Sequence, residues 1–279
     1  MPDYLDRKAL KKEARDLLGT AQVSPKAMTA LYLGLAAVLG VISALAGRGI
    51  SLFSLFLSIL VALLSLTLDA GFVLYCMTVR RRERAEYGVL FDGFGMVGKL
   101  ILLSLTKTLF VFLWSLLFVI PGIIAEYRYR FALYNLLENP DLDVMEAIGR
   151  SKRQTYGCKA KLFLLDLSYL GWELLASVPN IVYGQENRSL MTDAIAQVLY
   201  RGGDLSEMFD AALSVSGTVW GLPPLAWQII ISAWALVVSL FYFAHFRCVD
   251  LAYYEIAKQS SGVGDGAPLW EDDGGSSYL

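Results

Sequence analysis

The sequence predicts an all-α, polytopic membrane helical bundle with about six transmembrane helices and amphipathic cytoplasmic helices. Of its 279 residues, 56% are hydrophobic and 18% are charged, whereas an ordinary soluble domain has about 45–50% apolar and about 25% charged residues. Uncharged runs recur along the chain, and the first, residues 27–46, holds twenty residues. About this length crosses the hydrocarbon core of a bilayer. The composition and the uncharged runs together indicate a membrane protein.

Residues 1–26 predict an amphipathic cytoplasmic helix. They contain six Lys and Arg residues, and Leu10, Ala14 and Leu17 lie at helical spacing. A basic helix with one apolar face is typical of a segment that lies on the inner surface of a membrane.

The membrane domain is expected over residues 27–258. Its predicted spans are residues 27–46, 50–79, 99–120, 123–138, 162–183 and 219–246. Residues 184–218 are more polar and predict an extracytoplasmic loop with room for two short amphipathic helices. Residues 259–279 are rich in Gly, Ser and acidic residues, a composition that predicts a disordered tail.

A short interfacial helix is expected from Tyr87, just before the third span. Within it, residues 93–98 read GFGMVG and match the glycine pattern of dinucleotide-binding loops. That function needs a preceding strand and a βαβ unit, whereas an amphipathic helix precedes this segment and a membrane span follows it. We therefore expect the close-packed start of a helix and no bound cofactor.

Basic residues indicate whether the chain crosses the membrane after Pro121 and Gly122, the expected turn of a helical hairpin. Cytoplasmic loops carry the excess of Lys and Arg. If residues 123–138 cross, eighteen of the 24 Lys and Arg residues lie in cytoplasmic segments. If they do not cross, the basic stretch at residues 150–161 moves outside and the bias weakens. The distribution therefore favours six spans with both termini in the cytoplasm. Because the fourth span is short, its hairpin tip is expected to be buried against neighbouring helices.

Seven ionisable residues within the predicted spans form a candidate intramembrane polar network. They are Asp69, Lys107, Glu126, Arg128, Arg130, Asp166 and Glu173. At about 1.5 Å of rise per residue, most of them lie at similar depths, and Lys107 is expected to pair with Asp69 or Glu173. Glu126 and Arg130 are expected to share one helix face. The functional interpretation is a pathway or binding site for an ion, a polar solute or a lipid headgroup. The alternative, which the near balance of charges favours, is a structural network.

The segment after Asn139 and Pro140 predicts a cytoplasmic helix. Asp141 or Asp143 can cap it, and Glu146 near its start suits the helix dipole. The basic residues that follow are Arg150, Lys152, Arg153, Lys159 and Lys161. They form either a solvated cytoplasmic surface or a contact with anionic lipids.

Catalytic and metal-binding residues are not expected. The three cysteines are widely spaced and His245 is the single histidine, whereas a metal site needs three or four converging ligands. His245 is expected at the polar end of the last span rather than in a nucleophilic centre. The net charge of -2 gives no general signal for binding nucleic acid.

Several motifs carry a resemblance to a known family. They are Pro121-Gly122-Ile123, Tyr129, Glu138-Asn139-Pro140-Asp141-Leu142, Glu146-Ala147, Ser151 and the string KAKLFLLDLSYLGW, with LKKEARDLL and LFDGF upstream. Over roughly residues 7–256, this sequence resembles the bacterial membrane family known as domain of unknown function 975. The family is distantly similar to membrane domains of glycerophosphodiester phosphodiesterases. The resemblance implies a lipid-embedded helical module in the bacterial cytoplasmic (inner) membrane and brings no established activity or catalytic residues.

The expected function is that of a non-enzymatic membrane module that interacts with lipid or protein partners in the cell envelope. Its partners would be the bilayer, anionic lipids or other membrane proteins. The alternative is a small-solute or ion transporter or channel that uses the charged residues of the spans.

Overall fold

The computed structural model describes residues 7–46, 52–204, 206–208 and 219–262. The regular elements of these residues are helices, with one isolated β-bridge between Val219 and Leu222, which confirms the predicted all-α fold. Most of the expected disordered tail, residues 263–279, and part of the expected loop, residues 205 and 209–218, lie outside the described residues.

The chain divides into two compact units, Met1–Tyr169 with Tyr242–Leu279, and Leu170–Phe241. The first unit contains α1 (Arg7–Gly19), α2 (Pro25–Ala46), α3 (Leu52–Arg80), the 3₁₀ helix η1 (Tyr87–Met96), α4 (Val97–Leu117), α5 (Val119–Arg128), α6 (Ala132–Glu138), α7 (Val144–Gln154), α8 (Lys159–Leu167) and the last part of α11 (Pro224–Ser261). The second unit contains α9 (Leu170–Tyr200) and the first part of α11.

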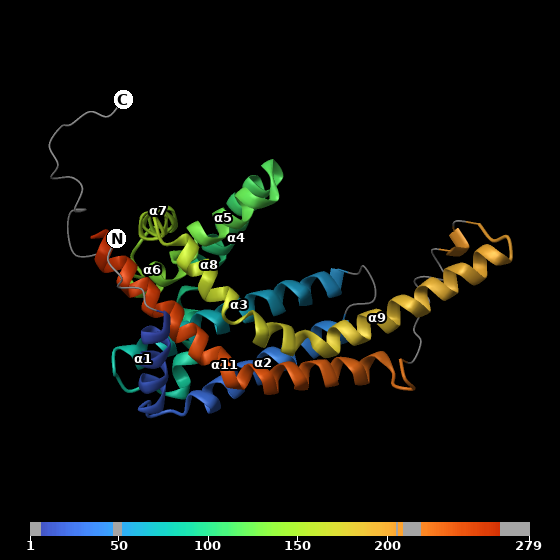
Figure 1. Ribbon diagram of the computed structural model, residues 1–279, viewed down its shortest axis with the longest axis horizontal. Helices are drawn as coiled ribbons and strands as arrows, with labels where there is room; N and C mark the ends of the chain where they lie inside the picture. Colours follow the sequence, from blue (N-terminus) through green and yellow to red (C-terminus); the bar gives the residue numbers. More distant parts are fainter. Residues whose placement is uncertain (1–6, 47–51, 205, 209–218, 263–279) are drawn as a thin grey trace. The chain divides into compact units, whose positions relative to one another are not determined.

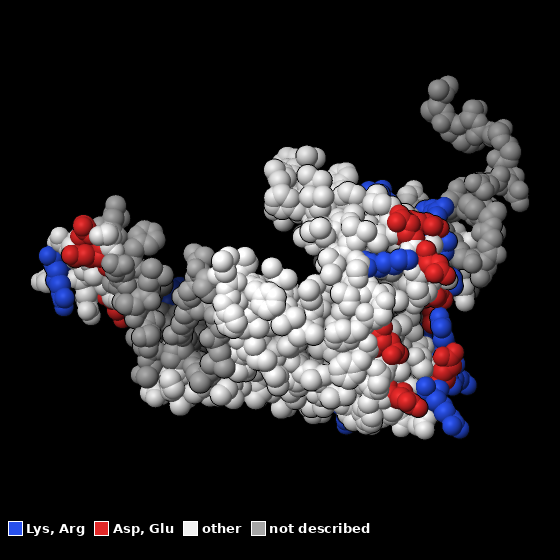
Figure 2. All heavy atoms as spheres, turned by 180° about the vertical axis from the view of Figure 1, so that it is seen from behind, with Lys and Arg blue, Asp and Glu red and all other residues white. Residues whose placement is uncertain are grey.

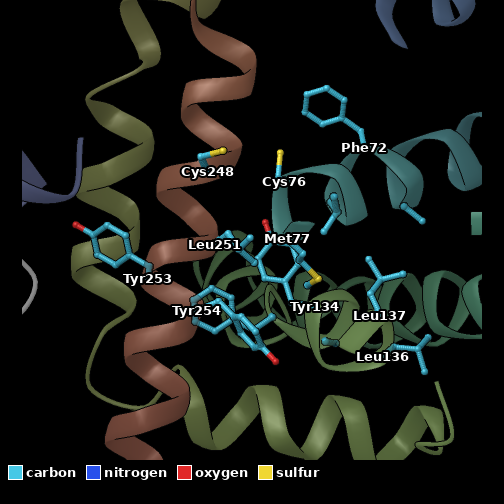
Figure 3. Packing of buried hydrophobic residues seen from close by; sticks show 14 of the residues in the cluster. Phe72, Cys76, Met77, Tyr134, Leu136, Leu137, Cys248, Leu251, Tyr253 and Tyr254 are labelled. Carbon is cyan, nitrogen blue, oxygen red and sulfur yellow. The ribbon is translucent and has the colours of Figure 1, made fainter. Parts of the chain in front are cut away.

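The core of the first unit lies where α3, α6 and α11 meet (Figure 3). Phe72 of α3 and Cys248 of α11 are fully enclosed, and the rings of Tyr134 and Tyr254 pack edge to face with their centroids 5.4 Å apart. The apolar face of α1 joins the same core through Leu10 and Ala14. The predicted amphipathic helix is therefore present, and its apolar face contacts protein.

Within the residues that the structure describes, four helical stretches are long and apolar enough to cross a membrane. They are residues 25–42, 52–80, 87–117 and 229–261, and a fifth is added if α8 and the start of α9 count as one bent span. These helices indicate a membrane protein. The predicted span at residues 123–138 is not one helix, because α5 ends at Arg128 and α6 begins at Ala132. Six crossings remain a prediction of the basic-residue distribution.

The break between α5 and α6 is stabilised by α7. Ser151, which is fully buried, donates a hydrogen bond to the carbonyl of Arg128 at 2.9 Å and accepts one from the backbone N–H of Phe131 at 3.1 Å. These contacts satisfy backbone groups that a continuous helix would have paired internally. The expected capping of α7 by Asp141 or Asp143 is resolved, since the Asp143 carboxylate accepts from the N–H of Met145.

The hairpin turn lies earlier than predicted. The chain reverses at Phe118, whose backbone is extended, and α4 and α5 then run side by side (Figure 1). Pro121 and Gly122 instead belong to the first turn of α5, where proline removes no needed hydrogen bond. Gly122 packs against Ser115 so closely that a Cβ at this position would clash. The expected burial holds for Gly122, which is buried, but the tip itself is exposed, because Phe118 exposes 73% of its surface.

The GFGMVG segment belongs to η1 and the start of α4. Gly71 of α3 faces the carbonyl of Leu90, and Gly93 faces the carbonyl of Thr67, with no room for a Cβ at either position. Of the glycines in this segment, Gly93 therefore allows the backbones of η1 and α3 to approach closely, whereas Gly95 and Gly98 have open space beside them.

The second unit corrects the predicted loop at residues 184–218. Helix α9 continues to Tyr200, so residues 184–200 are helical. Trp234 of α11 donates to the carbonyl of Leu175 at 2.8 Å, and Trp227 donates to the carbonyl of Val219 at 2.9 Å.

Candidate functional site

A polar pocket of about 430 Å³ lies at the base of the α4–α5 hairpin, in the first unit. Its lining residues are Asp69, Lys107, Ile123, Glu126, Tyr127, Arg130, Leu133, Tyr134, Asp166, Phe246, Arg247 and Asp250. We call this the hairpin pocket. It is assembled from α3, α4, α5, α6, α8, α11 and the α5–α6 break, so its shape depends on the fold of the whole unit.

The inner wall of the hairpin pocket is a clamp around Arg130, which lies in the break between α5 and α6. Its guanidinium donates two parallel hydrogen bonds to Asp166, at 2.7 and 2.8 Å, and a third to Asp250 at 2.8 Å. Tyr127 also donates to Asp166 at 2.8 Å. The side chain of Asp250 is only 4% exposed. A bidentate, charge-assisted pair of this kind fixes geometry as well as charge.

A second ion pair joins α3 to α11. Arg247 donates to Asp69, and the hydroxyl of Tyr32 lies 3.5 Å from the same carboxylate oxygen. The Arg247 guanidinium also lies over the ring of Phe243, 5.2 Å from its centroid. These contacts hold the pair between helices and leave little freedom for either side chain.

The outer pair of the hairpin pocket joins the two legs of the hairpin. Lys107 of α4 and Glu126 of α5 are 2.6 Å apart, and their side chains are 31% and 55% exposed. Because an exposed pair is only weakly stabilising, these charges can exchange partners at small cost. The outer pair is therefore the part of the pocket that a ligand can engage.

The structure brings five of the seven predicted network residues to one pocket. These are Asp69, Lys107, Glu126, Arg130 and Asp166. Arg128 does not line the pocket, and Glu173 belongs to the second unit. The expected pairing of Lys107 with Asp69 or Glu173 is wrong, because Lys107 pairs with Glu126. The expectation that Glu126 and Arg130 share one helix face is also wrong, because α5 ends at Arg128 and Arg130 lies beyond it, paired with Asp166 and Asp250.

Two members of the pocket, Arg247 and Asp250, were missed by the sequence analysis. The last span was expected to end at Phe246, which placed both residues in the cytoplasm. In the structure α11 continues to Ser261. The sequence from residue 225 to residue 261 contains neither Gly nor Pro. That uninterrupted run is the signal that favours a longer helix.

The predicted lipid-contact residues lie in α7 and at the start of α8. Arg150 pairs with Glu146 at 2.7 Å, and the Lys152 ammonium lies 5.8 Å from the ring centroid of Tyr129. Arg153 is exposed, while Lys159 and Lys161 are half-buried. Two of the five cations thus already have partners within the protein.

Apolar helices of spanning length around a charged pocket define an all-α membrane protein with a polar site. The chain belongs to the family described as protein of unknown function (DUF975), whose model matches residues 116–261. The match includes Arg130, Asp166 and Asp250, whereas Asp69 and Lys107 precede it. No curated protein and no solved structure matches the chain.

Proposed function

We propose that the protein is a non-enzymatic membrane module that binds the polar headgroup of a zwitterionic phospholipid in the hairpin pocket. The observation that carries this proposal is the position of a charged, open pocket at the base of an apolar hairpin. A lipid needs both surfaces, because its headgroup requires polar partners and its acyl chains require apolar ones.

The tip of the hairpin supplies the apolar surface. Its exposed side chains are Leu113, Trp114, Leu116, Leu117, Phe118, Val119, Ile120, Ile123 and Ile124, each between 41% and 73% exposed. The projecting hairpin carries no charged side chain at its tip in Figure 2. An exposed apolar surface of this extent marks contact with a membrane or a partner.

The length of the hairpin supports the placement of the pocket at headgroup level. Glu126 follows Phe118 by eight residues, which corresponds to about 12 Å of helix. The hydrocarbon core is about 30 Å thick, so each leaflet contributes about 15 Å. A tip at the bilayer midplane therefore places the outer pair close to the polar boundary. In this arrangement the hairpin enters one leaflet and returns, and residues 80–99 and 139–161 stay on the same side.

The charges of the hairpin pocket favour a zwitterion. Among the described lining residues, four carboxylates face three basic side chains. The surplus carboxylate suits an ammonium group, and Lys107 suits a phosphate. Phosphatidylethanolamine carries both groups. The Arg130 clamp would stay intact, because Arg130 and Asp250 are more enclosed than either member of the outer pair.

Lipid binding to the full-length protein tests this proposal. We expect replacement of the outer pair by Lys107→Gln with Glu126→Gln to lower the affinity for phosphatidylethanolamine by about tenfold, which corresponds to about 1.4 kcal/mol. The affinities are measured by native mass spectrometry of detergent-solubilised protein, with phosphatidylglycerol as the competing lipid.

A matched control removes one basic and one acidic side chain outside the pocket. Arg84→Gln with Glu86→Gln neutralises two exposed residues between α3 and η1 and should retain the affinity of the wild type. If the Lys107 and Glu126 variant also retains it, the hairpin pocket does not hold the headgroup.

Transport of a small solute or ion is the second candidate function. It is favoured by the break in the helical path at Tyr129–Phe131, which contains Arg130, because broken helices often frame substrate sites in transporters. Proteoliposomes distinguish the two candidates, since a transporter shows a solute or ion flux that the Lys107 and Glu126 variant loses.

We place the module in a bacterial cytoplasmic membrane, with both termini in the cytoplasm and the basic residues after Asn139 near anionic lipids. We further propose a distant similarity to membrane domains of glycerophosphodiester phosphodiesterases, which would suit a lipid-binding module, and an interaction with protein partners of the cell envelope.

A further inference from the structure

A second pocket lies where α1 crosses the end of α8, away from the hairpin pocket. It has a volume of about 510 Å³ and is lined by Arg7, Lys8, Lys11 and Ser168. None of these described lining residues is a carboxylate. Four polar side chains with up to three positive charges therefore face one space, which we call the basic pocket.

The cations of the basic pocket are held in place by the end of α8. Arg7 donates to the carbonyl of Leu164 at 3.2 Å, and Lys11 donates to the hydroxyl of Ser168 at 2.9 Å. The Lys11 ammonium also lies over the ring of Tyr169, 4.2 Å from its centroid. Side chains on packed helices lose little further freedom when a ligand binds, so these contacts prepare the pocket for an anion.

The backbone behind the basic pocket is fixed by His245. Its Nε2 lies 2.8 Å from the carbonyl of Lys11, and because a carbonyl only accepts, Nε2 carries the hydrogen. Its Nδ1 then accepts from the hydroxyl of Tyr169, 2.6 Å away. A single imidazole thus joins α1, the segment after α8 and α11, and keeps Lys11 at a constant position.

The basic pocket opens at the surface of the first unit. Arg7 and Lys8 are exposed and Lys11 is half-buried, whereas Leu10 and Ala14 of the same helix are buried in the core. Burial and the positive charge of Arg7 lower the pKa of Lys11. A bound anion would relieve this repulsion.

We infer that the basic pocket binds a phosphate group through the fork of Arg7 and the ammonium groups of Lys8 and Lys11, while the hydroxyl of Ser168 donates to the carbonyl of Leu165 and positions Lys11. A guanidinium matches two phosphate oxygens at once, and lysines add charge without a fixed geometry. A phosphate monoester carries more negative charge than a diester, so this set of cations favours the monoester. The source is either a lipid with a terminal phosphate or a soluble phosphate.

Isothermal titration of the full-length protein in detergent tests this inference. The probes are dihexanoyl phosphatidic acid, dihexanoyl phosphatidylglycerol and inorganic phosphate. We expect phosphatidic acid to bind more tightly than phosphatidylglycerol, and Arg7→Gln with Lys11→Gln to weaken its binding by about tenfold or more. Competition by inorganic phosphate identifies a soluble source, whereas binding only of the lipid identifies a headgroup.

A matched control separates the pocket from the general charge of α1. Lys12→Gln with Arg15→Gln removes the same charge from the same helix outside the basic pocket and should leave the affinity within about twofold of the wild type. Equal losses in both double variants, or equal binding of the two lipids, would overturn the inference.

Two further variants guard against misfolding and against confusion with the hairpin pocket. Lys8→Glu leaves the Arg7 and Lys11 contacts with α8 in place and should also abolish phosphatidic acid binding. Lys107→Gln with Glu126→Gln should leave that binding unchanged, so the two sites can fail independently. Full affinity in Lys8→Glu would show that the phosphate lies elsewhere.

Discussion

Asp250 shows how one enclosed carboxylate organises the hairpin pocket. It accepts hydrogen bonds from Arg130 and from the hydroxyl of Tyr134, while its side chain is 4% exposed. Removing one member of a buried ion pair leaves the other charge without compensation, which commonly costs about 3–5 kcal/mol. In the sequence Asp250 looks like an ordinary residue of a cytoplasmic helix end, and only its contacts identify it as part of a site.

We expect Asp250→Asn to destabilise the protein by about 3 kcal/mol, because the substitution keeps the shape of the side chain and removes its charge. Thermal unfolding in detergent, followed by circular dichroism, measures the change. Glu146→Gln, which neutralises an exposed carboxylate, should cost less than about 1 kcal/mol. Equal unfolding temperatures for Asp250→Asn and the wild type would contradict the role assigned to the clamp.

Glu138, the last residue of α6, lies outside the four stretches of spanning length. Tyr254 donates to its carboxylate at 2.6 Å, Lys258 at 3.1 Å and Arg81 at 3.5 Å. Burial alone would raise the pKa of Glu138, but these hydrogen bonds and positive charges lower it below its ordinary value. The folded state therefore favours the ionised carboxylate.

The lowered pKa of Glu138 predicts that this residue stabilises the folded protein at neutral pH and less so in acid. Because the folded-state pKa is depressed, the stabilisation by Glu138 is complete above the ordinary Glu pKa of about 4.3 and is lost as the pH falls through the folded value. Glu138→Gln should lower the unfolding temperature at neutral pH and lower it much less in acid. Melting curves of both proteins between about pH 3 and pH 7 measure this difference, and a difference independent of pH would speak against it.

At the scale of elements, close helix contacts depend on glycine at defined positions. Helix α3 meets η1 at Gly71, where a Cβ would run into the backbone of Leu90. Backbone atoms cannot rotate away as side chains can, so the whole 3₁₀ helix would have to shift. Since η1 leads directly into α4, its position also sets the start of the hairpin.

We therefore expect Gly71→Ala to destabilise the protein by about 1–3 kcal/mol, the usual cost of overpacking. Gly98→Ala is the control, because no atom lies within 4 Å of the added Cβ. Alanine is a better helix former than glycine by up to about 1 kcal/mol, so this variant should be neutral or slightly stabilised. Thermal unfolding of the two variants side by side measures the contrast, and a similar loss in both would argue against the packing explanation.

The sequence predicted those helices and turns that are determined by neighbouring residues, and it did not predict contacts that depend on tertiary packing. Residues 25–46 and 52–80 are uncharged or nearly so over long runs, and hydrophobicity alone indicated both helices. The turn at Phe118 was misplaced because Pro121 and Gly122 are ordinary turn residues that here serve helix geometry and packing. The partners of Arg130 and Lys107 depend on which helices pack together, and this information is spread over the whole chain.

On the scale of the whole molecule, the distribution of Lys and Arg predicts which segments share a side of the membrane. The segments before and after the α4–α5 hairpin lie on the same side of the membrane in both arrangements, whether the hairpin crosses the bilayer twice or enters one leaflet and returns. Tyr156, after α7, and Tyr200, at the end of α9, are 86% and 95% exposed. A cysteine at either position can therefore report which side of the membrane the segment faces, whereas a cysteine at the buried Ser151 would not be accessible to label.

We predict that a cysteine at Tyr156 is labelled by a membrane-impermeant maleimide only after cells are opened, and that a cysteine at Tyr200 is labelled in intact cells. Each substitution is made with Cys158→Ser, which removes the half-buried native thiol and leaves the buried Cys76 and Cys248. The positive-inside rule gives the reason. Labelling at Tyr156 from outside intact cells would reverse the topology of this part of the chain.

The apolar tip of the α4–α5 hairpin also bears on membrane shape. Its exposed residues, from Leu113 to Ile124, add volume to one leaflet when the hairpin enters to half depth, and the opposite leaflet receives no matching wedge. Insertions of this kind are sensitive to curvature. The protein is then expected to favour strongly bent bilayers, where the lipids of the occupied leaflet are already spread apart.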